Sequence, residues 1–455
     1  MSSTPEGKSL TIRNYLEVGE DNHLKIHGVD LVDLSDEYGS PLFVFDEVTL
    51  LESFRRFRQA FEKVYPKILV CYSLKTNNNL GICRTLAEDG AAADASSELD
   101  LFVARKSGFS GERIIYDGPF KPKAILRKAL EMRVLLVNME SIKEMQELNA
   151  VAGDMGVEQA VGLRINPFKR PSFFKSLHPN ALLEAGYGWP SCRFGFSEEE
   201  VRSVFKRLKE MKNLRLECIM MHPYSRALNV LMPLWKEAEE FGFELKYLNV
   251  GGGFDPGMTG YTSDFLLMLD FVRRKFGLKS SLDKAKQVRS IESVANSLIE
   301  ALKQQLGNLP EPTLITEPGR FITGPSAMLL VEVDHIKTAG GHRWIMVNGG
   351  TNILPIIDER RKILVANNAT ASSKELASIV GPLLYPKDFI AIRMPIPHVK
   401  EGDLIVVPDC GAYSISSSTQ FLYPRPAAVL VNSEGKAKLI REKETPGDVV
   451  SKDRL

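Results

Sequence analysis

The sequence predicts an α/β protein in which a (β/α)8 barrel is joined to a domain built of β-strands. Through about residue 320, short apolar runs alternate with segments of helical spacing. Beyond Arg320 the pieces are strand-like and separated by glycine and proline, with little helical periodicity. The length of 455 residues also exceeds one average domain. We therefore expect one large α/β domain and a smaller β domain.

The apolar runs of the first part are the strand candidates. They number eight, the count that a (β/α)8 barrel requires, and helical segments such as 123–132, 141–152 and 197–211 lie between them. A doubly wound sheet is the competing interpretation, and the count favours the barrel. The candidates are residues 68–74, 91–93, 113–116, 134–137, 160–165, 216–221, 245–250 and 313–316.

These patterns predict the domain limits. Residues 1–46 contain the strand-like "HLKIHGVDL" and "PLFVFD", and we expect them to join the β domain. Residues 47–320 would form the barrel, and residues 321–455 would form the β domain. The stretch 278–303 is rich in lysine and serine and then helical, so we interpret it as an insertion within the barrel.

Composition excludes several functional classes. Lys and Arg number 58 against 57 Asp and Glu, and no basic block stands out, so nucleic-acid binding is not predicted. The chain has no run of 18 apolar residues, so no membrane span is expected. The start lacks an apolar signal core, and the five cysteines show no C-x-x-C spacing. Both observations indicate a reducing, cytoplasmic location.

A set of polar residues and glycines follows the predicted strands. In a (β/α)8 barrel, chemistry collects at the C-terminal ends of the strands, so these groups should share one mouth. Each signal is weak alone, since a single lysine is usually a solvated charge and a glycine run is usually a turn. Their joint placement indicates a site. In order they are Lys75, Asp94, Asp117, Asn138, Arg164 with Asn166, His222, Gly251, Gly252, Gly253, and Glu317 with Arg320.

This set suits the chemistry of pyridoxal 5'-phosphate. The amine of Lys75 could form a Schiff base with the aldehyde, helped by desolvation at the strand end. The backbone of residues 251–253 could approach a phosphate. Glu317 could keep the pyridine nitrogen protonated, and the imidazole of His222 could stack on the ring. A metal is not predicted: His23 and His27 stand four apart on a strand-like segment without an evident carboxylate partner.

The motifs resemble those of the fold-type III pyridoxal-phosphate decarboxylases, the group of diaminopimelate and ornithine decarboxylases. The resemblance runs from about residue 30 to residue 432. It rests on "YSLKTN", "LNVGGGF", "EPGRF", "GDLIVVPDCGAYS" and "RPAAVLV". It implies a barrel followed by a C-terminal β-sandwich or Greek-key domain that includes the N-terminal strands. It also implies a homodimer with shared active sites.

The resemblance assigns roles to individual residues. From the resemblance and the departures from it, we predict that Lys75, His222, Tyr385 and Tyr413 take part in catalysis. Ser225 of "HPYSR" falls where the family has a phosphate-binding serine. The implied cofactor-binding residues are Lys75, Asp94, Arg164, His222, Ser225, Gly251, Gly252, Gly253, Glu317, Arg320 and Tyr413.

The chain departs from the family where the substrate is expected. Diaminopimelate decarboxylases carry a Gly-Pro-x-Cys-Glu motif, supplied by the other subunit, whose cysteine is linked to proton donation. Here "GPLLYPKD" places Leu384 at the cysteine and Tyr385 at the glutamate. Ile356 stands where a substrate-carboxylate arginine would be. The "STQFLYPRP" ending resembles decarboxylases of biosynthetic clusters. We therefore expect a free, conjugated or carrier-bound amino acid other than meso-diaminopimelate.

A leucine cannot donate the proton that Cα needs after decarboxylation. Tyr385, Tyr413, Lys75 or water could replace the thiol. Cys410 is a further candidate, although a buried structural thiol is the simpler interpretation. Without a donor, the outcome could be decarboxylative oxidation, transamination or racemisation. A cofactor-binding regulator without catalysis is the remaining alternative.

Overall fold

The computed structural model describes residues 15–166, 193–254, 289–355 and 362–455. The chain divides into two compact units: Phe54–Phe321, and Met1–Ser53 together with Ile322–Leu455. Ile356 and residues 278–288, which the sequence analysis singled out, lie outside the described residues. In the described part of the chain, no helix is long and apolar enough to cross a membrane.

The first unit contains a closed barrel of eight parallel strands. The order around the barrel is β10-β11-β12-β5-β6-β7-β8-β9, so neighbours in sequence are neighbours in space and the ring closes between β9 and β10. The fold class predicted from the count of apolar runs is confirmed. The strands are β5 (Ile68–Ser73), β6 (Ala92–Ala95), β7 (Ile114–Tyr116), β8 (Leu136–Met139), β9 (Gln159–Arg164), β10 (Leu214–Met220), β11 (Tyr247–Asn249) and β12 (Thr313–Thr316).

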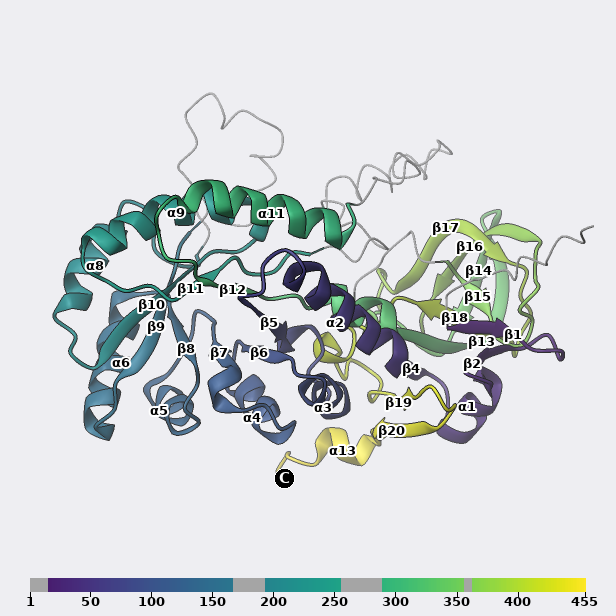
Figure 1. Cartoon of the computed structure of the whole chain (residues 1–455). Coiled ribbons are helices and arrows are strands. Elements are labelled where there is room, and N and C mark those ends of the chain that lie inside the picture. The colour runs from purple at the N-terminus through teal and green to yellow at the C-terminus, as the bar shows by residue number, and fades with distance from the viewer. Residues whose placement is uncertain (1–14, 167–192, 255–288, 356–361) are drawn as a thin grey trace, which may run out of the picture. The chain divides into compact units, whose positions relative to one another are not determined.

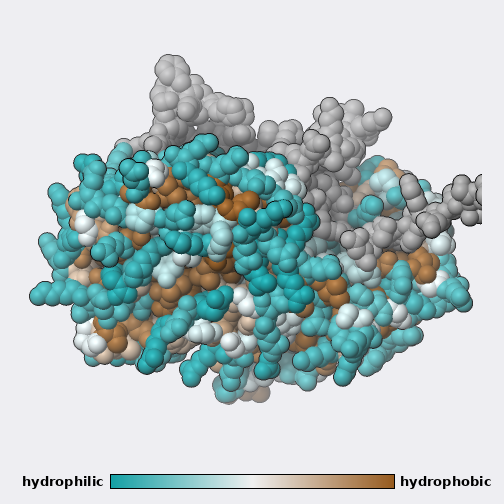
Figure 2. Space-filling view, viewed as in Figure 1, coloured by the Kyte–Doolittle hydropathy of each residue, from teal (hydrophilic) through white to brown (hydrophobic). Residues whose placement is uncertain are grey.

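Helices connect the strands and lie outside them (Figure 1). Several begin at a side chain that caps the first turn, as Asn79, Ser97 and Ser141 do. On the face drawn in Figure 2 the described surface is mostly hydrophilic, with smaller hydrophobic areas. The helices are α2 (Glu47–Glu62), α3 (Leu80–Glu88), α4 (Glu98–Lys106), α5 (Lys123–Glu131), α6 (Ile142–Met155), α8 (Val201–Lys209), α9 (Tyr224–Glu240) and α11 (Ile291–Leu306).

Helix α11 corrects the predicted insertion. It occupies most of the described part of 278–303 and lies between β11 and β12, where the barrel requires a crossover helix. Its core-facing residues are Ile291, Val294, Ala295, Leu298, Ile299 and Leu302, spaced three and four apart. The polar residues between them contribute to the composition that suggested an insertion.

The second unit is built mainly of strands. A nine-stranded sheet has the order β17-β16-β14-β13-β4-β19-β20, and β18 pairs with both β13 and β15. The strands are β4 (Leu42–Asp46), β13 (Ala327–Ala339), β14 (His342–Val347), β15 (Leu364–Val365), β16 (Lys374–Val380), β17 (Phe389–Pro397), β18 (Leu404–Pro408), β19 (Ala427–Val431) and β20 (Ala437–Arg441). The N-terminal β4 pairs with β13 and β19 and so belongs to this sheet.

A small sheet and a helix cover part of this unit's core. The sheet comprises β1 (Leu16–Val18), β2 (Leu24–Ile26) and β3 (Val29–Asp30), and α1 spans Leu31–Tyr38. Leu24 and Leu31 pack in one buried cluster with residues of β4, β13, β18 and β19. The remaining described α-helices are α12 (Arg320–Thr323) and α13 (Pro446–Val450).

Candidate active site

A polar layer lies above an apolar layer inside the barrel. The apolar layer packs as one cluster of Cys71, Ala92, Ile115, Leu136, Ala160, Cys218, Met220 and Ile315. Side chains alternate along a strand, so residues two positions further on also face the interior. Counting on by two from these positions gives Ser73, Asp94, Asp117, Asn138, Gly162 and Glu317.

Three carboxylates crowd into this layer. Asp94, Asp117 and Glu317 each contribute an oxygen within 4.8 Å of the others, and they are only 0%, 4% and 5% exposed. Asn138 donates a hydrogen bond to Asp117, and Asn249 Nδ2 donates to Glu317 Oε1 over 2.7 Å. Asp94 Oδ1 accepts no hydrogen bond. The layer therefore concentrates negative charge with few donors to compensate it.

This crowding changes the acidity of two carboxyl groups. Burial, followed by the charge of Asp94, raises the pKa of Asp117 to about 6. Burial also raises the pKa of Glu317 well above its usual range, with further contributions from Asp117 and Asp94. Because their charges repel each other, these groups do not titrate independently.

Lys75 lies at the mouth of the barrel. It sits in a short 3-10 turn, Leu74–Thr76, just after β5 ends at Ser73. Its Nζ is 3.4 Å from Asp94 Oδ2, and Ser73 Oγ donates to the same oxygen over 2.6 Å. The side chain is 50% exposed, so the expected desolvation is not found. The turn carries Lys75 past the buried strand and leaves its amine accessible.

Arg164 brings a positive charge to the same layer. It ends β9, and its Nη1 donates to Glu140 Oε1 over 2.8 Å. The guanidinium carbon is 4.5 Å from the centre of the Phe194 ring, within the range of a cation–π contact. The ion pair fixes the arginine while its charge acts on Asp117 and Glu317.

His222 follows β10 and is held by the glycine loop. Its Nδ1 lies 3.1 Å from the amide nitrogen of Gly252 and accepts that N–H, so a neutral ring carries its hydrogen on Nε2. Loss of water around the ring lowers the pKa of His222 to about 4, although the residue as a whole is exposed, and the charges of Lys75 and Arg164 add to this effect. The imidazole is therefore neutral at ordinary pH.

The glycine loop requires glycine at each of its first two positions. A Cβ on Gly252 would lie 2.5 Å from the carbonyl oxygen of Glu317, and one on Gly251 would lie 2.9 Å from that of Met221. Gly251 and Gly253 also have left-handed φ angles of 67° and 93°. The N–H of Gly251 is already used, since it donates to Asn249 Oδ1 over 2.8 Å. Gly253 is the exposed member of the three.

Two further predicted residues begin helices. Ser225 is the second residue of α9, and Arg320 is the first of α12. Ser225 lines a cavity of about 240 Å³ together with Tyr224 and Arg289. Beside the loop, the ring of Tyr224 stacks on that of Phe254 at 4.3 Å.

The other predicted residues belong to the β domain. Tyr413 has a φ of 56°, a left-handed conformation that is uncommon for a bulky side chain. Leu384 is 92% exposed and Tyr385 is 46% exposed. Cys410 is fully buried, and its thiol donates to the carbonyl of Val407 over 3.0 Å. This geometry is that of a structural thiol.

Sequence reasoning gave no individual role to four residues of this region. Asp117 and Asn138 were predicted to lie at the barrel mouth, but no function was assigned to them, although the alternation along β7 and β8 places both inside. Asn249 lies within "LNVGGGF", where only the glycines were interpreted. Glu140 had no local signal, because its role depends on meeting Arg164 of the neighbouring strand β9.

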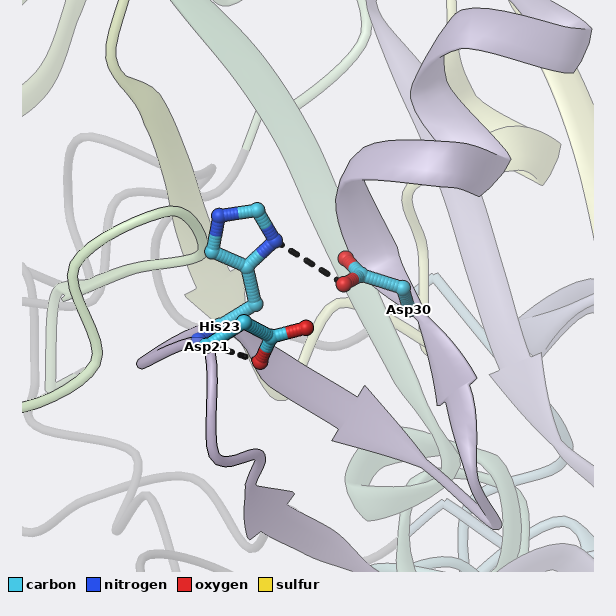
Figure 3. A group of neighbouring side chains, drawn as sticks. All are labelled: Asp21, His23 and Asp30. Atoms are coloured by element: carbon cyan, nitrogen blue, oxygen red, sulfur yellow. Dashed lines mark hydrogen bonds and ion pairs between the residues drawn. The ribbon is translucent and has the colours of Figure 1, made fainter.

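A second cluster of acidic and histidine side chains lies in the β domain (Figure 3). His23 Nδ1 is 2.9 Å from Asp30 Oδ2, while Asp30 Oδ1 caps α1 by accepting the N–H of Val32. Asp21 pairs with Lys25 over 2.9 Å. His27 pairs instead with Asp46 over 2.7 Å. The expectation that His23 and His27 lack carboxylate partners is therefore wrong, because the partners come from the ends of β3 and β4.

Comparisons with known proteins identify the family of the chain. Residues 50–324 match the family model "Pyridoxal-dependent decarboxylase, pyridoxal binding domain". The chain is 31% identical to the diaminopimelate decarboxylase of Aquifex aeolicus, over 94% of this chain and 95% of that protein. It is 30% identical to that of Methanothermobacter thermautotrophicus, over 96% of each. The crystal structure of diaminopimelate decarboxylase from M. jannaschii in complex with L-lysine matches with a TM-score of 0.81 and 26% identity, covering 97% of this chain and 98% of that one.

The barrel residues fit pyridoxal phosphate. The exposed amine of Lys75 can reach an aldehyde, and the unpartnered oxygen of Asp94 and the raised pKa of Glu317 suit a site for a protonated ring nitrogen. Glycines at positions 251 and 252 keep the loop free of side chains close to His222. When bound, the cofactor supplies the aldehyde and an aromatic ring that accepts the electron pair left at Cα. The chain thus belongs to the pyridoxal-dependent decarboxylase family and is a pyridoxal-phosphate-dependent carboxy-lyase.

Proposed function

We propose that the protein decarboxylates an amino acid or amino-acid conjugate other than meso-diaminopimelate, and that a group other than a thiol protonates the product. The observation that carries this proposal is Leu384. The resemblance to the family places this residue where a proton-donating cysteine is expected, and its side chain is 92% exposed. An apolar side chain offers no proton.

The loop that carries Leu384 is firmly built. Asp388 Oδ2 accepts the N–H of Leu383 over 2.8 Å, and its Oδ1 accepts the N–H of Thr351 over 2.7 Å. Gly381 and Gly350 are close enough that a Cβ on either would meet the Asp388 carboxylate at 2.4 Å. A loop held at several points presents Leu384 outward as a defined feature of the surface. This supports the view that the segment has a different role in this protein, as opposed to having lost its function.

A cavity beside this loop supports a distinct substrate. It has a volume of about 530 Å³, and its described lining contains aromatic and aliphatic groups with one charged side chain, Lys387. Such a wall favours a partly apolar group. The lining residues are Thr351, Asn352, Pro355, Leu383, Tyr385, Lys387, Thr419 and Phe421.

Within the barrel, we assign roles from the geometry. Lys75 would hold the cofactor covalently, with its amine oriented by Asp94 through the 3.4 Å ion pair. Glu317, positioned by Asn249, would accept a hydrogen bond from the ring nitrogen. The neutral imidazole of His222 would pack against the ring. Arg164 offsets the buried negative charge.

Further residues are assigned to the phosphate of the cofactor and to the contact with a partner subunit. Gly251, Gly252, Gly253, Ser225, Arg320 and Tyr413 would surround the phosphate. We also propose that the chain forms a homodimer, in which the loop of Leu384 and Tyr385 faces the active site of the partner. The half-exposed apolar and aromatic residues Tyr385, Phe421 and Leu422 support such a contact. The described cysteines are all free, which supports a cytoplasmic location.

The proton for Cα must come from another group. Tyr385 and Tyr413 each offer a phenol, and the amine of Lys75 lies at the barrel mouth. If none delivers the proton efficiently, the same carbanion chemistry ends in oxidation, transamination or racemisation. The buried, hydrogen-bonded thiol of Cys410 is not a suitable donor.

The second candidate substrate is meso-diaminopimelate itself. The names of the relatives favour it, since several matched over nearly their whole length are diaminopimelate decarboxylases. The experiment is a competition assay: the purified holoenzyme receives an equimolar panel of amino acids that includes meso-diaminopimelate. Preferred release of CO2 from another amino acid supports the proposal. Preferred conversion of meso-diaminopimelate to lysine contradicts it.

A further inference from the structure

The polar layer holds more carboxylate charge than its surroundings neutralise. Asp94 has the ammonium of Lys75 at 3.4 Å and the hydroxyl of Ser73 at 2.6 Å. Asp117 and Glu317 have only neutral amide donors, from Asn138 and Asn249. All three carboxylates lie within 4.8 Å of one another and are buried. Two unscreened charges at such a distance repel strongly, and sharing a proton removes this repulsion.

We infer that Asp117 shares one proton with Glu317 before the cofactor binds, and that this proton is held for the pyridine nitrogen. This makes Asp117 a further positioning residue of the cofactor site. The transfer breaks the O–H bond of a carboxylic acid and forms an N–H bond on the ring, leaving a carboxylate beside a pyridinium. Atoms and charge balance without a third reactant. The inference rests on the cofactor of the family and is independent of the proposed substrate.

The positive charges of Lys75 and Arg164 act on the pair but are shared with other carboxylates, so they offset the charge of the pair only in part. Lys75 pairs with Asp94 at the mouth, and Arg164 of β9 donates to Glu140. His222 is neutral, because its pKa is lowered to about 4.

Two thiols also border the layer from below. Burial raises the pKa of Cys71 and of Cys218, so both stay neutral and neither adds charge. Burial also raises the pKa of the neighbouring Asp100, and the negative charge of Asp94 adds to this rise. The surroundings therefore favour protonation of the pair formed by Asp117 and Glu317.

The test counts protons as pyridoxal phosphate binds. The full chain is stripped of cofactor, treated with a chelator and titrated by calorimetry in two buffers of different ionisation enthalpy. At about pH 8, wild type already holds the proton. In Asp117→Asn one cause of the raised pKa of Glu317 is removed while burial remains, so a larger fraction of Glu317 is ionised than in wild type. The variant should then take up more protons than wild type, by at most about one per site. Protons exchanged at Lys75 and at the phosphate are the same in both proteins, so they cancel in the difference between the two proton counts.

The matched control is Asn138→Ala. It removes the amide that donates to Asp117 but leaves all three carboxylates in place. It should bind with the proton count of wild type. Equal counts for wild type and Asp117→Asn would overturn the inference. A change in Asn138→Ala as large as that in Asp117→Asn would also overturn it, because it would show a merely structural role.

A second measurement needs only the wild-type chain. Infrared spectroscopy of the cofactor-free protein at about pH 8 should show the C=O band of a protonated carboxylic acid, which ordinary Asp and Glu lack there. Addition of pyridoxal phosphate should remove it. Absence of the band before addition would mean that both groups are ionised and would refute the inference. Neither readout depends on decarboxylation, so failure here is distinct from failure to find a substrate.

Discussion

The barrel and the β domain each bury carboxylates, but they surround them in opposite ways. In the β domain, Asp388 is 4% exposed and accepts hydrogen bonds from the N–H and hydroxyl of Thr351, over 2.7 and 3.0 Å, and from the N–H of Leu383. In the barrel, Asp94, Asp117 and Glu317 crowd together, and one oxygen of Asp94 has no hydrogen-bond partner.

This difference distinguishes a carboxylate that holds the structure together from carboxylates that form the candidate site. A buried carboxylate that is fully hydrogen-bonded fixes the chain around it, as Asp388 fixes residues 350–351 and 381–383. A crowded set with unmet hydrogen bonds stores electrostatic free energy that a cofactor can release. The β domain thus uses its charge to shape the surface around Leu384. The barrel uses its charges to prepare a binding site.

The largest effect is expected at Lys75. Lys75→Ala should reduce decarboxylation by roughly a thousandfold or more, because the covalent attachment of the cofactor is lost. The visible absorption of the bound cofactor should disappear, and borohydride reduction should add no cofactor mass to the protein. Lys143→Ala, at a side chain that is 84% exposed, is the control and should behave as wild type. An unchanged spectrum in Lys75→Ala would remove Lys75 from the site.

The next effect is on stability in the β domain. Asp388→Asn replaces one carboxylate oxygen by an NH₂ group, which then faces one of the two backbone N–H groups that donate to Asp388, so we expect a loss of about 2 kcal/mol in the free energy of unfolding. Chemical denaturation of the full chain measures this loss. Asp334→Asn, at a side chain that is 73% exposed, should change it by less than about 0.5 kcal/mol. Equal stability of Asp388→Asn and wild type would show that the loop does not depend on this residue.

Asp117→Asn should stabilise the cofactor-free protein against unfolding, and the size of this gain should depend on pH. The folded-state pKa of Asp117, about 6, lies above its ordinary value of 3.8. Its contribution to stability is therefore present below about pH 4 and is lost as pH rises through 6. The substitution removes this loss, so the cofactor-free variant should be more stable than wild type by on the order of 2 kcal/mol at about pH 8. Thermal unfolding from about pH 4 to 8 should show this gain shrinking with acidity, and a constant difference would count against the crowded layer.

The smallest effect concerns product distribution. Leu384→Cys restores a thiol at an exposed position of an otherwise intact loop. If the missing thiol limits protonation at Cα, the share of simple amine among the products should rise by a few-fold. Leu384→Ser, which adds a hydroxyl of similar size but much lower acidity, is the matched control. Mass spectrometry of the products checks both variants, and identical product ratios in Leu384→Cys and wild type would exclude protonation as the reason for the departure.

The barrel could be predicted because its signals are local. Eight apolar runs follow one another at the spacing of strands, and each ends beside a polar residue or glycine that only the C-terminal mouth can use. Lys75, His222 and Glu317 could therefore be assigned to one site from their positions alone. The helical part of 278–303 was recognised but interpreted as an insertion, whereas helix α11 lies between β11 and β12 as the barrel requires.

The remaining features depend on contacts between distant residues. Glu140 matters because it meets Arg164, 24 positions away, and Asp388 matters because it meets Thr351, 37 positions away. The half-exposure of Lys75 follows from a 3-10 turn that strand periodicity does not reveal. The crowding of Asp117 with Glu317 arises only when the barrel closes.

The most direct test of the central claim is a product survey of the purified holoenzyme. L- and D-amino acids, their conjugates and meso-diaminopimelate are incubated with the enzyme, with and without oxygen, and the products are identified by mass spectrometry. We predict loss of CO2 from an amino acid other than meso-diaminopimelate, with Lys75→Ala inactive on the same substrate. Efficient conversion of meso-diaminopimelate in preference to every other compound would contradict the account.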